Sequence, residues 1–107
     1  MTVYKVYIPS SVMKDIQEII DYISEDNPSV ALGILDRIEN RINTLREFPE
    51  RGRVVPELFD HNIIEYHELI ENPWRIIYKI IGNDVFILTI IDGRRNVQDI
   101  LLRKLMK

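Results

Sequence analysis

The sequence of 107 residues contains no cysteine. Without thiols there can be no disulfide framework, no thiolate nucleophile and no cysteine-ligated zinc, and a reducing compartment suits the chain. A chain of this length is nevertheless large enough to bury one hydrophobic core without covalent cross-links. We therefore predict a single domain that spans residues 1–107.

Long apolar runs are also missing. The N-terminal segment MTVYKVYIPSS lacks the uncharged apolar core of a secretory signal peptide, and no run approaches the roughly 18 apolar residues that cross a membrane. We expect a cytoplasmic protein with no membrane partner.

Familiar catalytic motifs are scarce. There is no glycine-rich phosphate loop, no G-x-S-x-G motif and no histidine pair at helical spacing, so we expect no metal and no small-molecule cofactor. The two histidines are His61, beside Asp60 in a polar segment and best interpreted as surface, and His67. His67 lies in a predicted strand and is either a structural, hydrogen-bonded residue or a proton donor or acceptor near neutral pH.

The net charge of -3 gives no overall attraction to nucleic acid, but the charges are unevenly placed. Residues 15–26 carry five acids and no base, whereas residues 94–107 carry five bases and one acid, Asp99. The basic residues of the second segment are Arg94, Arg95, Arg103, Lys104 and Lys107. They form either a local patch that attracts a polyanion or the ordinary solvated side of a C-terminal helix.

The chain is organised around a predicted β-hairpin within residues 74–95. Residues 74–81 (WRIIYKII) alternate between an apolar side and a side with a charge at every second position, and Gly82-Asn83-Asp84 is typical of a tight turn. Residues 85–91 (VFILTII) are apolar enough for a strand buried on both faces. Asp92-Gly93 breaks this strand, so Arg94 and Arg95 emerge together at its end.

The remaining periodicities predict an α+β fold. We expect an N-terminal strand (2–8), an antiparallel helical hairpin, a three-stranded antiparallel meander forming one sheet, and a short C-terminal helix from residue 97. The first helix of the hairpin is expected to be capped by Ser10 or Ser11, and the second to run from Asn27-Pro28 to about Phe48. Residues 48–62 have no period and predict a loop, and residues 63–70 predict the first strand of the meander.

Arg75 permits two interpretations. It can form an ion pair with Glu68 on the exposed face of the sheet, which would contribute little if solvated. It can also be a permanently charged clamp for phosphate or carboxylate on a rigid strand, which the dense apolar surroundings favour.

Three segments together resemble the RelE/ParE superfamily of bacterial or archaeal type II toxin-antitoxin toxins. They are FPERGRVVPEL (48–58), EYHELIENPWRIIYKI (65–80) and LTIIDGRR (88–95), and they follow the order of the superfamily pattern. The resemblance implies a small α+β toxin of the plasmid-stabilisation type. It also implies a cognate antitoxin protein whose flexible segment wraps around the toxin.

The resemblance leaves two targets open. RelE-like toxins are ribosome-dependent, metal-independent mRNA endoribonucleases, and ParE-like toxins inhibit DNA gyrase. In a nuclease, Arg75 and Arg95 match arginines of the superfamily pattern that bind phosphate, and His67 is the candidate acid or base. A gyrase inhibitor would use a basic surface, and the candidate residues for target or antitoxin binding are Arg53, Arg75, Arg94, Arg95, Arg103 and Lys104.

Departures from the nuclease pattern favour gyrase inhibition. Leu101 stands where many nucleases have a C-terminal tyrosine and cannot transfer a proton. Tyr66-His67-Glu68 replaces a strand that usually carries lysines, so an acid stands where phosphate binding needs a base. A degenerate, inactive toxin is the third possibility that the sequence leaves open.

Overall fold

The computed structural model describes residues 3–106. Thr2 of the predicted first strand and Lys107 of the predicted basic segment lie outside the described residues. The elements follow one another as β1 (Lys5–Tyr7), α1 (Ser10–Ser24), α2 (Pro28–Thr44), η1 (Pro49–Arg51), β2 (Arg53–Val54), α3 (Pro56–Phe59), β3 (Tyr66–Glu71), β4 (Trp74–Ile81), β5 (Asp84–Asp92) and α4 (Val97–Leu105).

The strands form one five-stranded sheet in the order β1-β5-β4-β3-β2. The predicted meander β3-β4-β5 is confirmed as three antiparallel neighbours, and β1 pairs in parallel with β5. The prediction of a plain loop over 48–62 is wrong, because this segment contains η1, the edge strand β2 and α3. These pieces have two to four residues each, which is too short for a period to appear in the sequence.

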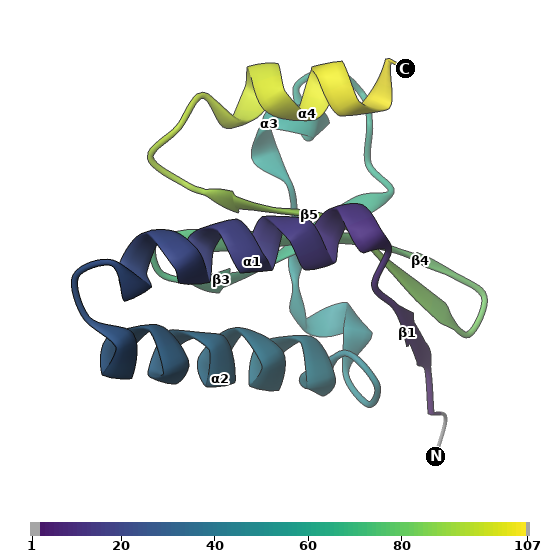
Figure 1. Ribbon diagram of the computed structural model, residues 1–107. Coiled ribbons are helices and arrows are strands. Elements are labelled where there is room, and N and C mark those ends of the chain that lie inside the picture. The colour runs from purple at the N-terminus through teal and green to yellow at the C-terminus, as the bar shows by residue number, and fades with distance from the viewer. Residues whose placement is uncertain (1–2, 107) are drawn as a thin grey trace.

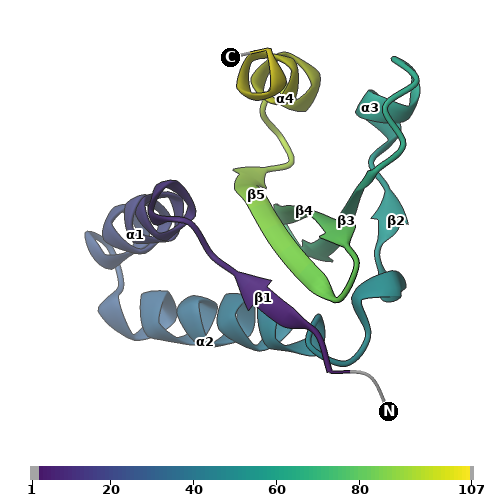
Figure 2. The same cartoon turned by 90° about the vertical axis from the view of Figure 1, so that its right-hand side faces the viewer.

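The helical hairpin covers one side of the sheet, which we call the inner face (Figures 1 and 2). Alternation along β4 directs Ile76 and Tyr78 to this face, where they meet the apolar sides of α1 and α2. Ile38 of α2 and Val12 of α1 are fully buried in this core. The larger of two hydrophobic cores therefore lies on the inner face, as the apolar stripes of the two helices predict.

The opposite side of the sheet, the outer face, carries Arg75, Ile77 and Lys79. We expected this face to be exposed, but α3 and α4 cover much of it and form a second core. Leu58 of α3 and Leu101 of α4 are fully buried there, together with Ile77. The two helices lie on the side of the sheet away from α1 and α2 (Figure 2).

Local sequence signals set most of the helix ends. Asn27 caps α2, since its side chain accepts a hydrogen bond from the backbone N–H of Val30 at 3.2 Å, with Pro28 as the first helical residue. The side chain of Asn96 caps α4 in the same way, since it accepts a hydrogen bond from the backbone N–H of Asp99 at 3.1 Å. The predicted serine cap of α1 is wrong, because Ser10 already belongs to the helix. Helix α2 ends at Thr44 rather than near Phe48.

No helix within residues 3–106 is both long and apolar enough to cross a membrane.

Candidate functional site

Arg75 lies at the centre of a group of charged side chains on the outer face. Its Nε donates to Glu68 Oε1 at 2.6 Å, and its two terminal nitrogens donate to the two carboxylate oxygens of Glu57 at 2.7 Å each. The second oxygen of Glu68 accepts from Arg53 Nε at 2.6 Å. We call Arg53, Glu57, Glu68 and Arg75 the Arg75 cluster.

The Arg75 cluster joins four elements of the outer face. Arg53 comes from β2, Glu57 from α3, Glu68 from β3 and Arg75 from β4. Pairing in the sheet places Arg53 directly beside Glu68. Glu68 is 1% exposed and Arg75 is 8% exposed. The ion pair between Arg75 and Glu68 that the sequence indicates is therefore present, but it is buried rather than solvated.

Charge and burial act together on these groups. The bidentate hydrogen bonds from Arg75 lower the pKa of Glu57 below its usual value, against a smaller opposing effect of burial. The same carboxylate raises the pKa of Arg75, which stays charged at every accessible pH. A guanidinium that already makes three hydrogen bonds to two carboxylates has little capacity left for a phosphate.

His67 lies on the other side of the sheet from Arg75. It pairs across the strands with Tyr78, and the two rings are 6.0 Å apart, so His67 faces the helical hairpin. Its Nδ1 atom is buried and has no hydrogen-bond partner among residues 3–106. Since the sheet separates His67 from Arg75, the two side chains cannot act on one phosphate group.

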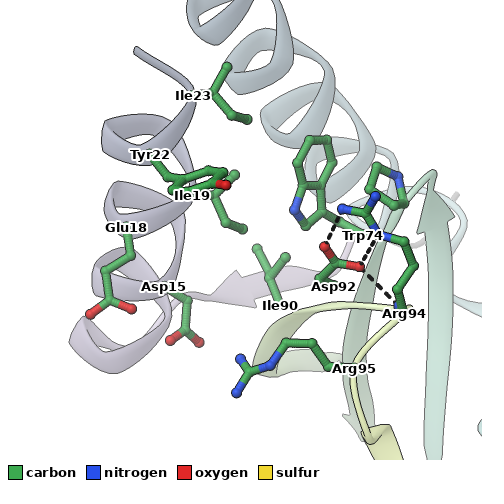
Figure 3. A pocket seen from close by; sticks show the side chains of 11 residues that line it. Asp15, Glu18, Ile19, Tyr22, Ile23, Trp74, Ile90, Asp92, Arg94 and Arg95 are labelled. Atoms are coloured by element: carbon green, nitrogen blue, oxygen red, sulfur yellow. Dashed lines mark hydrogen bonds and ion pairs between the residues drawn. The ribbon is translucent and has the colours of Figure 1, made fainter. Parts of the chain in front are cut away.

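A groove of about 670 Å³ lies between α1 and the ends of β4 and β5 (Figure 3). Its lining is apolar in the middle and charged on both sides. The apolar residues are Ile19, Ile23, Pro73, Trp74 and Ile90, together with the ring of Tyr22. Asp15 and Glu18 form an acidic side on α1, and Arg94 and Arg95 lie across from them on the segment that follows β5.

The two groove arginines have different surroundings. Arg94 makes a close ion pair with Asp92, at 2.7 Å, and this contact lowers the pKa of the Asp92 carboxyl to about 2. Arg95 is exposed, and its side chain lies on the groove side opposite Asp15. Arg95 is thus the better placed of the two to receive an anionic group from a partner.

The other predicted basic residues lie on α4. Arg103 is exposed and forms an ion pair with Asp99, one helical turn away, at 2.7 Å. Lys104 is half-buried. The basic residues therefore divide into three places, namely the Arg75 cluster, the groove and α4, rather than one continuous patch.

Sequence reasoning missed Glu57 and the acidic side of the groove. Pro56 followed by an acid is the only local signal for α3, because proline is favoured at the first position of a helix and acids in its first turn. Asp15 was recognised only as part of an acidic run, although its carboxylate accepts a hydrogen bond from Thr89 of β5 at 2.9 Å. No group of three His, Asp or Glu side chains within residues 3–106 is placed to bind a metal ion.

Known proteins share both sequence and fold with this chain. The family model described as the ParE toxin of the type II toxin-antitoxin system parDE matches residues 6–97. Toxin ParE3 of Caulobacter vibrioides is 33% identical over 88 residues, which cover 78% of this chain and 80% of that toxin.

Two solved structures have the same fold. The chromosomal ParDE toxin-antitoxin system of P. aeruginosa has a TM-score of 0.61 at 21% identity and covers 86% of this chain and 96% of its own. The RelBE2 toxin-antitoxin complex of Mycobacterium tuberculosis has a TM-score of 0.59 at 17% identity and covers 86% and 93%. The match over residues 6–97 establishes the resemblance seen in the sequence: the chain belongs to the ParE toxin family of type II toxin-antitoxin systems.

Proposed function

We propose that this toxin arrests growth by inhibiting DNA gyrase and does not cleave RNA. The observation that carries the proposal is the Arg75 cluster, in which the arginine that a nuclease needs for phosphate is occupied by Glu57 and Glu68. Metal-independent RNA cleavage requires cations for the developing negative charge and groups that move protons. Two carboxylates beside Arg75, the only buried arginine among residues 3–106, oppose the first requirement.

The proton-transfer groups are also unfavourably placed for a nuclease. His67 faces the helical hairpin, on the side of the sheet opposite Arg75. Leu101 is fully buried in the second core and offers no polar atom. A gyrase inhibitor needs none of these groups, because it acts by binding.

The target surface that we propose is the basic side of α4 with the adjoining segment, represented by the exposed Arg95 and Arg103 and the half-buried Lys104. The test is the supercoiling of relaxed plasmid by purified gyrase at increasing toxin concentration. We expect inhibition by the wild-type chain and an inhibitory concentration at least tenfold higher for Arg103→Glu/Lys104→Glu. Arg46→Glu, which reverses an exposed charge just after α2, is the matched control and should behave as the wild type.

Supercoiling that is unaffected at saturating toxin, together with cleavage of mRNA on translating ribosomes, would replace gyrase inhibition by the RelE-like activity. In that case Arg75→Met should abolish cleavage. A chain that neither inhibits gyrase nor cleaves mRNA, and whose expression leaves growth normal, would be an inactive toxin.

We further propose that the groove between α1 and the sheet receives a segment of the cognate antitoxin. An amphipathic segment fits its lining: an apolar side against Ile19 and Trp74, basic residues toward Glu18, and acidic residues toward Arg95. Trp74 is the single tryptophan of the chain, so its emission reports on the groove. Titration with a tryptophan-free antitoxin should shift this emission to shorter wavelength, and Ile19→Asp should weaken binding by more than tenfold.

A further inference from the structure

Four side chains from four neighbouring strands form a row across the outer face, near the turn between β4 and β5. The strand register places Tyr7 beside Phe86, Phe86 beside Lys79, and Lys79 beside Tyr66. Directly paired residues project from the same face of a sheet, so the row runs from β1 through β5 and β4 to β3. We call these residues the aromatic row.

The neighbours of the row along each strand fix its side of the sheet. Val6, Val85, Ile87 and Tyr78 all pack into the core beneath the helical hairpin. Because successive side chains of a strand point to opposite faces, the aromatic row lies on the outer face. Tyr66, the β3 member of the row, is part of the second core on this face.

The row pairs aromatic rings with a cation. The rings of Tyr7 and Phe86 stack with their centroids 4.9 Å apart and their planes at 11°. The Lys79 ammonium lies 5.5 Å from the centre of the Tyr66 ring. Tyr7 is 43% exposed, and Phe86 and Lys79 are half-buried, so the row forms part of the surface.

Tyr7 offers a ring face for a further stacking partner. One face of its ring contacts Phe86, and the other points away from β5, toward the edge of the sheet formed by β1. Two more cations flank the row on the same face, the exposed Lys5 at this edge and Arg53 at the far edge. The acid at the near edge is Asp84, which pairs with Lys5 in the register.

We propose that the aromatic row is a binding site for single-stranded nucleic acid, in which a base stacks on Tyr7 and Lys79 pairs with a backbone phosphate. Stacking platforms on a sheet beside basic groups are the general means by which proteins bind single strands. A duplex keeps its bases stacked inside and cannot use such a platform. Neither Tyr7 nor Lys79 lies on α4 or lines the groove, so the site does not depend on the proposed gyrase inhibition.

The test is fluorescence anisotropy of labelled octanucleotides, oligo(U) and oligo(dT), titrated with the full chain at low salt. We expect binding by the wild type that weakens by about tenfold in Tyr7→Leu, which keeps an apolar side chain but loses the ring, and is retained in Tyr7→Trp. Lys79→Met should reduce the slope of log affinity against log salt by about 0.7, the contribution of one phosphate contact to a single strand. Phe48→Ala, at an exposed aromatic residue outside the row, is the matched control and should bind as the wild type.

Several outcomes would overturn the site. They are no binding of either octanucleotide by the wild type, equal or tighter binding of a duplex of the same length, or equal affinity for the wild type and Tyr7→Leu. Thermal unfolding monitored by circular dichroism shows whether each variant is folded, so a loss of binding by an unfolded variant is recognised. Tighter binding of oligo(U) than oligo(dT) would identify RNA as the ligand, and the reverse would identify DNA. Running the supercoiling assay on Tyr7→Leu separates the two proposals, because gyrase inhibition should be unchanged.

Discussion

The two faces of the sheet are stabilised in different ways, although strand β4 contributes alternate residues to both. The inner face is an apolar core between the strands and two long helices, with Ile76 and Ile38 fully buried. The outer face has a smaller core under two short helices, with the Arg75 cluster beside it. Burial of apolar area is insensitive to pH, whereas ion pairs are not. We therefore expect the stability contributed by the outer face to depend on its charged residues and on pH, unlike that contributed by the inner face.

Arg75→Met should have the largest effect, because it removes the guanidinium and leaves the Glu68 carboxylate buried with only Arg53 as a partner. Loss of one member of a buried ion pair costs about 3–5 kcal/mol of the free energy of unfolding. The measurement is urea denaturation at pH 7. The variant Arg75→Met/Glu57→Gln/Glu68→Leu, which removes all three charges, should recover most of the loss.

Ile38→Ala is the matched change on the inner face. It should cost about 2–5 kcal/mol through lost burial and a cavity, with the same loss at pH 5 and pH 8.

The triple variant Arg75→Met/Glu57→Gln/Glu68→Leu tests the role of charge in the Arg75 cluster. If this variant does not recover stability, Arg75 contributes by packing of its stem rather than by charge.

Gly52→Ala should have the next largest effect. A Cβ atom at this position would meet the Tyr78 hydroxyl and lie 2.6 Å from the backbone oxygen of Glu68. It would disturb the hydrogen bonds in which the buried hydroxyl donates to Pro49 O at 2.6 Å and accepts from the Gly52 N–H at 3.1 Å. We expect a loss of about 1–3 kcal/mol in thermal or urea unfolding. Burial raises the pKa of Tyr78 to about 12, so this loss should not change between pH 6 and pH 9.

The pH dependence of Glu57 gives a smaller effect. Since Arg75 lowers its pKa in the folded state, the unfolded state binds more protons, and the contribution of Glu57 is complete above its ordinary pKa of 4.5 and lost as the pH falls through the lower, folded value. The expected contribution is about 1 kcal/mol for a partly exposed pair. Unfolding free energies of the wild type and Glu57→Gln should converge as the pH falls below 4.5. Parallel curves would contradict the assignment.

Gly33→Ala should have the smallest effect and the opposite sign. Gly33 lies within α2, and a Cβ atom there would meet nothing within 4 Å. Replacing a glycine inside a helix by alanine stabilises it by about 0.5–1 kcal/mol. The midpoint of thermal unfolding should therefore rise, in contrast to Gly52→Ala. A fall would indicate that the helix needs the glycine for a reason that its surroundings do not show.

Long segments with a regular hydrophobic period could be predicted from the sequence. The apolar stripes of the helical hairpin, the alternation in β4 and the start of α2 at Asn27-Pro28 correspond to the structure, because each is determined by residues close together in the chain. The cover over the outer face could not be predicted in this way. It depends on the contact between α3 and α4, two short helices that are far apart in the sequence, and no pattern within either helix indicates that they meet.

The site was predictable only in part. Spacing along neighbouring strands indicated the pair between Arg75 and Glu68. It indicated neither the burial of this pair nor the second carboxylate, because Glu57 lies on the short helix α3 and not on a strand. The separation of His67 from Arg75 follows from the register of β3 and β4, since a shift of one residue exchanges the two faces. The sequence, read without a register, placed both residues in a common nuclease hypothesis.

The parallel pairing of β1 with β5 has a consequence for the order of events during protein synthesis. Lys5–Tyr7 is synthesised before its partner, residues 84–86, and 76 residues lie between the two segments. The helical hairpin can assemble locally, but the first strand must wait for the last, a contact of high sequence separation that slows folding. Until then the nascent chain shows an unpaired strand, and a product released before residue 84 cannot close its sheet.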